Sequence, residues 1–205
     1  MLQGHKDRLY SGGKDGKVKV WYYSSVLMPR ADLFYFFDHV GMDIPVSSIM
    51  FKPNSEILIA STTGKVFEIG EVGSVTLKEP KISTRVNGFA INNLRKEIIV
   101  TSEDSYVQCW NYTTFEITKS KHTGMPHHAV TYYREYSRIL IADQKGKINI
   151  WRDNQQMDCI SKIQSCFTKP EERITDIQLS TSGRFVSVTA RRSPSKLDIF
   201  EILES

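Results

Sequence analysis

The chain has 205 residues, of which 40% are hydrophobic and 24% charged, and its formal net charge is +4. That length suffices for one well-packed domain, and the composition is globular rather than disordered. The positive residues are scattered along the chain, which argues against a dedicated nucleic-acid module. The cysteines Cys109, Cys159 and Cys166 form no CxxC pair, so we expect neither a disulfide scaffold nor a zinc site.

No segment of the sequence is suited to a membrane. Residues 1–8, MLQGHKDR, lack the apolar stretch of a signal peptide. The longest apolar runs, 33–37 and 57–60, are far too short to span a bilayer. We therefore expect a soluble, cytoplasmic protein with no membrane partner.

Short alternating segments separated by turns recur along the whole chain. In the first unit, residues 8–12 and the segment that ends at Trp21 have this pattern. In the later units the pattern predicts strands at 45–51, 56–61, 65–69 and 72–77, at 86–91, 96–102, 106–110 and 115–119, at 129–133, 138–142, 147–151 and 157–163, and at 175–179, 184–189 and 197–202.

Five of these segments end in an aromatic or branched apolar residue at nearly regular intervals of 48, 41, 41 and 49 residues. The five residues are Trp21, Ile69, Trp110, Trp151 and Phe200. A period of about 40–45 residues with four short strands is typical of β-propeller blades. The sequence thus predicts an all-β fold of four-stranded antiparallel blades, with about four to five blades over 1–205. The blade units are predicted at 1–43, 44–84, 85–126, 127–172 and 173–205.

The first unit carries the most specific motif. Gly4-His5, Ser11, Asp15 and Trp21 have the spacing of the WD40 repeat, and the chain resembles that family. The resemblance implies that His5, Ser11, Asp15 and Trp21 form a structural hydrogen-bond set. It also implies that Trp110, Trp151 and Phe200 anchor the cores of later blades. The same residue types occur in a catalytic triad, but no nucleophile-elbow motif accompanies them, so we favour the structural role.

Later units depart from the motif, and the ends of the chain look incomplete. Val100 stands at the serine position of the third unit, and Lys145 at the aspartate position of the fourth. Only two residues separate His5 from the strand at 8–12, so the first strand of that unit is predicted to be missing. The fifth unit has no clear fourth strand. We expect a piece of a larger propeller whose open edges associate, while closure as five blades stays open.

The resemblance implies a non-enzymatic scaffold for protein–protein interactions, without cofactor or metal. Three histidines, His122, His127 and His128, fall in a predicted loop over 119–128, but no carboxylate or cysteine stands at a useful spacing for a metal. Candidate partner-binding loop residues are Lys14, Glu103, Lys121, His127, Lys145, Arg173, Arg191 and Arg192. Candidate phosphorylation sites are Ser193 and Ser195, beside two arginines.

A narrower resemblance concerns the turn at 11–16, Ser-Gly-Gly-Lys-Asp-Gly, which is similar to that of echinoderm microtubule-associated-protein-like and ciliary WD40 proteins. It implies tubulin or another acidic protein surface as partner, and a cytoskeletal or ciliary location. Two alternatives are a propeller-based hydrolase and a nucleic-acid-binding propeller. The first requires acidic or histidine residues converging from the inner strands, and the second requires basic residues interleaved with exposed aromatics. The sequence shows neither pattern.

Overall fold

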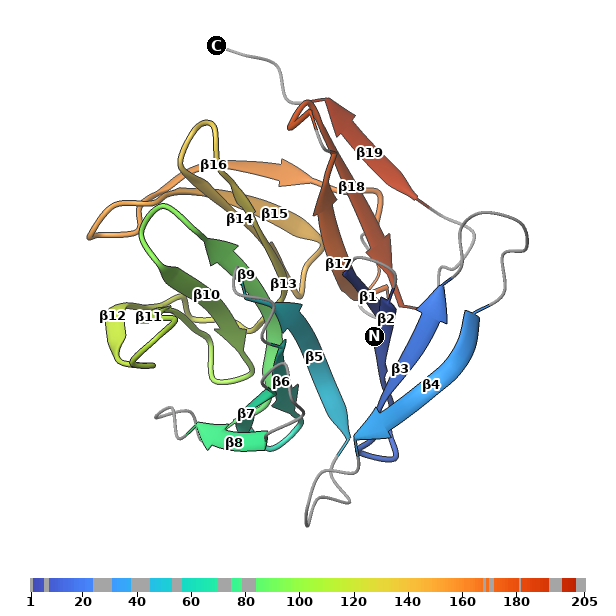
Figure 1. Ribbon diagram of the computed structural model, residues 1–205. Coiled ribbons are helices and arrows are strands. Elements are labelled where there is room, and N and C mark those ends of the chain that lie inside the picture. The colour runs from blue at the N-terminus through green and yellow to red at the C-terminus, as the bar shows by residue number, and fades with distance from the viewer. Residues whose placement is uncertain are drawn as a thin grey trace. The chain divides into compact units, whose positions relative to one another are not determined.

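The computed structural model describes residues 2–5, 8–23, 31–37, 45–52, 57–69, 75–78, 84–167, 169, 172–180, 182–191 and 197–201. Within these ranges the protein is all-β, with antiparallel strands in five sheets (Figure 1). None of the described residues belongs to a long apolar helix of the kind that crosses a bilayer. The chain divides into two compact units, unit 1 (Met1–Val86) and unit 2 (Asn87–Ser205).

Unit 1 holds two four-stranded sheets in which consecutive strands are neighbours. The first comprises β1 (Leu2–His5), β2 (Arg8–Gly12), β3 (Val18–Tyr23) and β4 (Ala31–Phe37), and the second β5 (Val46–Phe51), β6 (Ile57–Ser61), β7 (Val66–Ile69) and β8 (Val75–Lys78). Apolar side chains of both sheets form one core: Tyr10, Val18, Val20, Ile49, Phe67 and Ile69. Each sheet buries one apolar face against the other, as propeller blades must, because a single blade has no core of its own.

The first sheet contains the inner strand that the sequence analysis expects to be missing. In β1, Leu2 pairs with Ser11 and His5 with Arg8, so this prediction was wrong. The segment Leu2-Gln3-Gly4-His5 lacks the alternating branched apolar residues that mark the other inner strands. Backbone pairing with the edge of β2 is enough to form the strand, and that pairing leaves no signal in side-chain pattern.

Unit 2 holds the other three sheets and begins with the second residue of β9. The strands are β9 (Val86–Asn92), β10 (Glu97–Ser102), β11 (Tyr106–Asn111) and β12 (Ile117–His122), then β13 (His127–Tyr133), β14 (Arg138–Asp143), β15 (Lys147–Arg152) and β16 (Cys159–Gln164), then β17 (Ile174–Leu179), β18 (Phe185–Ala190) and β19 (Asp198–Glu201). In its described part the last sheet has three strands.

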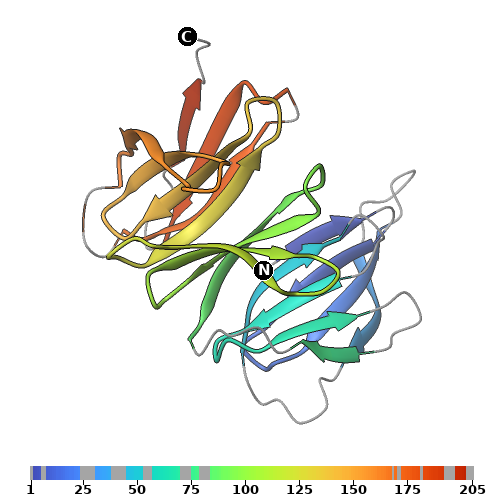
Figure 2. The ribbon, with the colours of Figure 1, turned by 90° about the vertical axis from the view of Figure 1, so that its left-hand side faces the viewer.

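The β13–β16 sheet lies between the other two sheets of unit 2 and buries both faces (Figure 2). Because successive side chains of a strand point to opposite faces, β14 contributes alternately to two cores. One core joins Ile139, Ile141 and Trp151 to the β9–β12 sheet. The other joins Leu140 and Ala142 to the β17–β19 sheet. A strand that is apolar at every position is therefore a central strand of a stacked blade.

Candidate functional site

The hydrogen-bond set of the first blade is described in part. Trp21 Nε1 donates to Ser11 Oγ at 2.8 Å, across ten residues of sequence. The Asp15 carboxylate accepts a hydrogen bond from the backbone N–H of Lys17 at 3.2 Å, as expected for an aspartate in a tight turn. The His5 side chain lies outside the described residues, so a complete set with His5 stays a prediction.

The aromatic residues of later blades find other partners. Trp110 is fully buried, and its Nε1 donates to Gln108 Oε1 at 3.0 Å. Trp151 is also buried, but its Nε1 has no hydrogen-bond partner among the described residues. Phe200 is half-buried against the core between the last two sheets. Without a serine ten residues before each tryptophan, these blades rely on packing more than on the hydrogen-bond set of the first blade.

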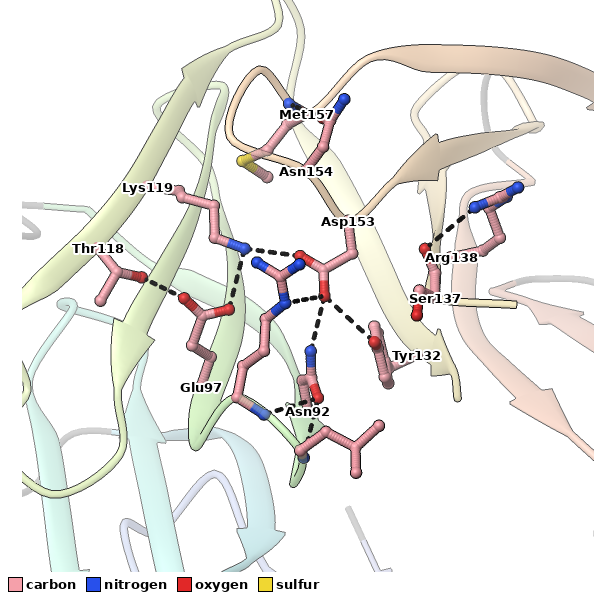
Figure 3. A network of polar contacts seen from close by, with 12 residues as sticks. Asn92, Glu97, Thr118, Lys119, Tyr132, Ser137, Arg138, Asp153, Asn154 and Met157 are labelled. Carbon is pink, nitrogen blue, oxygen red and sulfur yellow. Dashed lines mark hydrogen bonds and ion pairs between the residues drawn. The ribbon is translucent and has the colours of Figure 1, made fainter. Parts of the chain in front are cut away.

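Unit 2 contains a buried cluster of charges that the sequence analysis missed (Figure 3). Lys119 Nζ lies 2.6 Å from Asp153 Oδ1 and 2.9 Å from Glu97 Oε2. The side chains of Lys119, Glu97 and Asp153 are only 3%, 9% and 1% exposed. The cluster joins two blades, because Glu97 and Lys119 belong to β10 and β12 while Asp153 follows β15.

Further donors surround Asp153. Its Oδ2 accepts hydrogen bonds from Asn92 Nδ2 at 2.6 Å and from the Tyr132 hydroxyl at 3.1 Å. Arg95 Nε lies 3.6 Å from the same oxygen. Burial alone would favour neutral Lys119, but hydrogen bonds to Asp153 and Glu97 outweigh it, so the pKa of Lys119 is raised. The two carboxylates therefore stabilise the charged ammonium form of Lys119.

The cluster does not have the properties of a catalytic or metal site. Every carboxylate in it faces a cation or a hydrogen-bond donor, as buried charges must. Burial raises the pKa of the adjacent Cys109 thiol to about 12, so this thiol stays protonated and unreactive. Within the described part of the chain, no group of three or more His, Cys, Asp or Glu residues is placed to hold a metal ion.

The sequence predicts a loop over 119–128 that begins at Lys119, the last residue of a predicted strand, but in the structure Lys119 and His127 both lie within strands. Lys119 belongs to β12, and His127 is the first residue of β13 and only 2% exposed. The His127 ring packs edge-on against Trp151 at 6.2 Å between centroids, and burial lowers its pKa to about 4. His127 is therefore not a partner-binding loop residue. A signal was present: the alternation that continues from Ala129 extends back to His127.

The turn between β14 and β15, the segment that leads into β17 and the residue that follows β18 carry most of the remaining candidates. The backbone N–H of Arg191 donates to the carbonyl of Arg173 at 2.8 Å, which brings two exposed arginines together. In the neighbouring blade, Ser165 N–H donates to the carbonyl of Gly146 at 3.0 Å. Exposed basic residues gather on these segments, and we call them the basic end of unit 2: Lys145, Lys147, Lys169, Arg173 and Arg191.

Two carboxylates at the basic end are tied to backbone. Asp143 Oδ1 accepts hydrogen bonds from the N–H groups of Lys145 and Lys147 at 2.8 and 3.0 Å. Asp143 thus takes the turn-closing role two residues before the position where the repeat pattern places Lys145. Asp198 Oδ2 accepts from the N–H of Cys166 at 2.5 Å. These carboxylates shape the turns, while the cations face solvent.

The other predicted site residues are dispersed. Lys14 is exposed on a turn of unit 1, and Glu103 is half-buried between β10 and β11. Lys121 is exposed on β12 rather than on a loop, and its Nζ donates to the carbonyl of Gln156 at 3.2 Å. The remaining candidates lie outside the described residues: Arg192, Ser193 and Ser195.

Comparison with known proteins shows the fold and no closer relationship. No family model matches the sequence, and no curated protein matches it either. Among 1496 matching chains of solved structures is one from the crystal structure of the mitotic checkpoint complex. It has a TM-score of 0.80 and 14% sequence identity over 100% of this chain and 61% of that chain.

The protein has the fold of WD40-type β-propeller blades. It spans less than two thirds of the length of the matched checkpoint-complex chain. The likeness shows the architecture alone. Because propeller folds carry many unrelated functions, the function of this chain has to be argued from particular residues.

Proposed function

We propose that the protein is a non-enzymatic scaffold that binds an acidic segment of a partner protein through the basic end of unit 2. The observation that carries the proposal is the pairing of exposed Arg173 and Arg191, whose backbones are hydrogen-bonded at 2.8 Å. Two adjacent arginines offer paired donors that match carboxylates. Lys145 and Lys147 extend the same positive end into the neighbouring blade.

The basic end is built on backbone that is held in place before a partner arrives. Ser165 Oγ donates to the carbonyl of Gly146 at 2.6 Å, and Phe167 next to it is fully buried. A prearranged loop loses little conformational entropy on binding, which favours affinity. Clustered positive charge also attracts acidic partners and accelerates their encounter at low salt.

The alternatives have less support. A hydrolase would need carboxylates or histidines free to act, whereas the buried carboxylates Glu97 and Asp153 are neutralised by Lys119. A single-stranded nucleic-acid surface would need exposed aromatic side chains among the cations for base stacking. At the basic end, the described aromatic residue is Phe167, and it is buried.

The narrower resemblance of residues 11–16 favours tubulin among the candidate acidic partners and a location at the cytoskeleton or cilium. We extend the proposal to a cytoplasmic location on that basis. Co-sedimentation of the purified chain with microtubules tests this part. Recovery in the supernatant at low salt would remove tubulin as a candidate and leave the acidic-partner proposal in place.

The binding proposal itself is tested by fluorescence anisotropy with a labelled 12-residue Glu/Ser peptide. The variant Arg173→Glu/Arg191→Glu should weaken binding at least about tenfold, and wild-type affinity should fall as salt rises. Lys65→Glu/Lys162→Glu is the matched control, because it makes the same change in net charge at exposed strand and turn positions elsewhere. Equal weakening by both variants would show that net charge alone acts, and would overturn the site.

A further inference from the structure

A second surface lies at the opposite ends of the strands from the basic end. In unit 2, three turns meet there: 93–96 between β9 and β10, 134–137 between β13 and β14, and 152–157 after β15. In a blade of antiparallel strands the first and third connections lie at the same end. We call these three segments together the turn surface.

Asp153 ties the three turns to one another (Figure 3). Its backbone N–H donates to the carbonyl of Ser137 at 3.1 Å, which joins the second and third turns. Its carboxylate accepts from Asn92 at 2.6 Å, and Asn92 Oδ1 in turn accepts from the N–H groups of Leu94 and Arg95 at 3.1 and 3.2 Å. The backbone and the buried carboxylate of Asp153 therefore connect all three turns.

The backbone of each turn contains a residue in an uncommon conformation. Lys96, Ser137 and Met157 have φ values of 55°, 49° and 53°, a region that disfavours side chains with a Cβ. Polar contacts hold these conformations: Arg138 Nη1 donates to the carbonyl of Tyr136 at 2.7 Å, and Asn154 Oδ1 accepts from Met157 N–H at 2.7 Å. Such conformations persist where the surroundings over-determine them, and they concentrate at functional sites.

The fixed turns present large apolar and basic side chains to solvent. Leu94 is 65% exposed and Tyr136 38% exposed. The same three turns carry four exposed basic residues: Arg95, Lys96, Arg134 and Arg152. The exposed acidic residues there are Glu135 within the turns and Asp158 just beyond them. Tyrosine and arginine are enriched at the energetic centres of protein interfaces, and rigid presentation of such residues lowers the entropy cost of binding.

The buried charges have a clearer role in positioning than in stability. Replacing a buried ion pair by apolar residues of similar volume is often neutral or stabilising. The pair of Lys119 and Asp153 is thus weak evidence that the fold needs these charges for its stability. The effect of the pair on the positions of the three surface turns is direct.

We propose that the turn surface is a second docking site, and that it takes an acidic protein segment carrying a large apolar side chain. The apolar side chain packs against Leu94 and Tyr136, and the acidic residues face Arg95, Lys96, Arg134 and Arg152. The site differs from the basic end in requiring an apolar anchor, and it does not depend on the function proposed for that end.

Two labelled 12-residue peptides test the proposal: a Glu/Ser peptide with a central Phe, and the same peptide with Ser in place of Phe. The Phe peptide should bind the full chain about tenfold more tightly. Leu94→Ser and Leu94→Ser/Tyr136→Ser should remove this preference. Arg173→Glu/Arg191→Glu should weaken both peptides at the basic end and leave the preference. Ile160→Ser, at a 42% exposed position on β16, is the matched control and should change nothing.

Each variant is first checked for an unchanged circular dichroism spectrum and melting temperature. Equal affinity for the two peptides would overturn the proposal. So would a preference for the Phe peptide that survives Leu94→Ser, because Leu94 is more exposed than Tyr136. A single-stranded oligonucleotide of equal charge is measured in parallel. If it binds more tightly than the Phe peptide and competes with it, the surface is a nucleic-acid site and the proposal is wrong.

Discussion

Asp153 Oδ1 lies 2.6 Å from Lys119 Nζ, with the two side chains 1% and 3% exposed. The pair links the outer strand of one blade to the turn that follows β15 in the next. Both side chains are almost fully buried, so water screens the pair little. Removing either partner alone takes the nearest counter-charge from the other, and leaves Lys119 with Glu97 or Asp153 with the exposed Arg95.

Asp153→Asn should destabilise the protein by about 3–5 kcal/mol, because Lys119 loses its main counter-charge in a dry site. Urea unfolding of the full chain measures this. Arg184→Ala is the control, because Arg184 and Glu201 form an exposed pair whose loss should cost less than about 1 kcal/mol. The double variant Lys119→Met/Asp153→Asn should lose less than the sum of the single changes. An Asp153→Asn variant as stable as the control would show that the cluster is not a buried ion pair in solution.

Ser11→Ala should cost about 1 kcal/mol, since the part-buried indole N–H of Trp21 then loses its acceptor. The same substitution at exposed Ser161 on β16 provides the comparison and should be nearly neutral. Thermal or urea unfolding distinguishes the two. Equal stabilities for the two variants would mean that the hydrogen bond of the first blade contributes nothing measurable.

Gly146→Ala should be far more harmful than Gly124→Ala. Both glycines have positive φ, +74° and +79°, so both substitutions strain the backbone by about 1 kcal/mol. At Gly146 an added Cβ would also fall 1.8 Å from the carbonyl oxygen of Phe167, whereas at Gly124 it meets nothing within 4 Å. We expect a total loss of about 3 kcal/mol or more at Gly146. Similar melting temperatures for the two variants would contradict the close approach of that loop.

Stability should fall as the pH drops from about 6.5 toward 4, in part through His127. Burial lowers the pKa of His127 from 6.5 to about 4, with Asp143 and His128 as the charged neighbours. In that pH window the unfolded chain binds a proton that the folded chain excludes, so acidification favours unfolding by up to about 1.4 kcal/mol per pH unit.

Unfolding free energies of His127→Phe and wild type at pH 7, 6 and 5 isolate this contribution. The variant should lose part of the pH dependence, while His122→Gln, at an exposed position, should keep nearly all of it. If His127→Phe has the wild-type pH profile, His127 is protonated in the folded protein and is not buried as described.

The all-β architecture was predictable because the two-residue period of a strand and the length of a blade both produce a regular pattern of apolar side chains in the sequence. The regular placement of Trp21, Ile69, Trp110, Trp151 and Phe200 predicted blades, and the structure confirms antiparallel four-stranded sheets. β1 escaped prediction because its pairing depends on backbone groups alone. The predicted loop over 119–128 was too long because lysine and histidine usually indicate exposure, whereas Lys119 is buried with Asp153 and Glu97 as ion-pair partners and His127 is buried against Trp151.

The charge cluster was not predictable from sequence. Glu97, Lys119 and Asp153 are separated by 22 and 34 residues, and no local motif connects them. Their contact arises only when two blades stack. Arg173 and Arg191 also lie apart in the sequence, and β17 and β18 bring them together. Sequence indicated both as candidates, but their adjacency is a property of the fold.

The central claim is that acidic protein segments bind at the basic end of unit 2, and amide chemical-shift mapping tests it most directly. The isotopically labelled chain is titrated with the Glu/Ser peptide that lacks an apolar residue. We predict that the largest shifts fall at 143–147, 165–167, 169, 173 and 191. Shifts that are absent there, or equally large on the exposed strand β16, would contradict the claim.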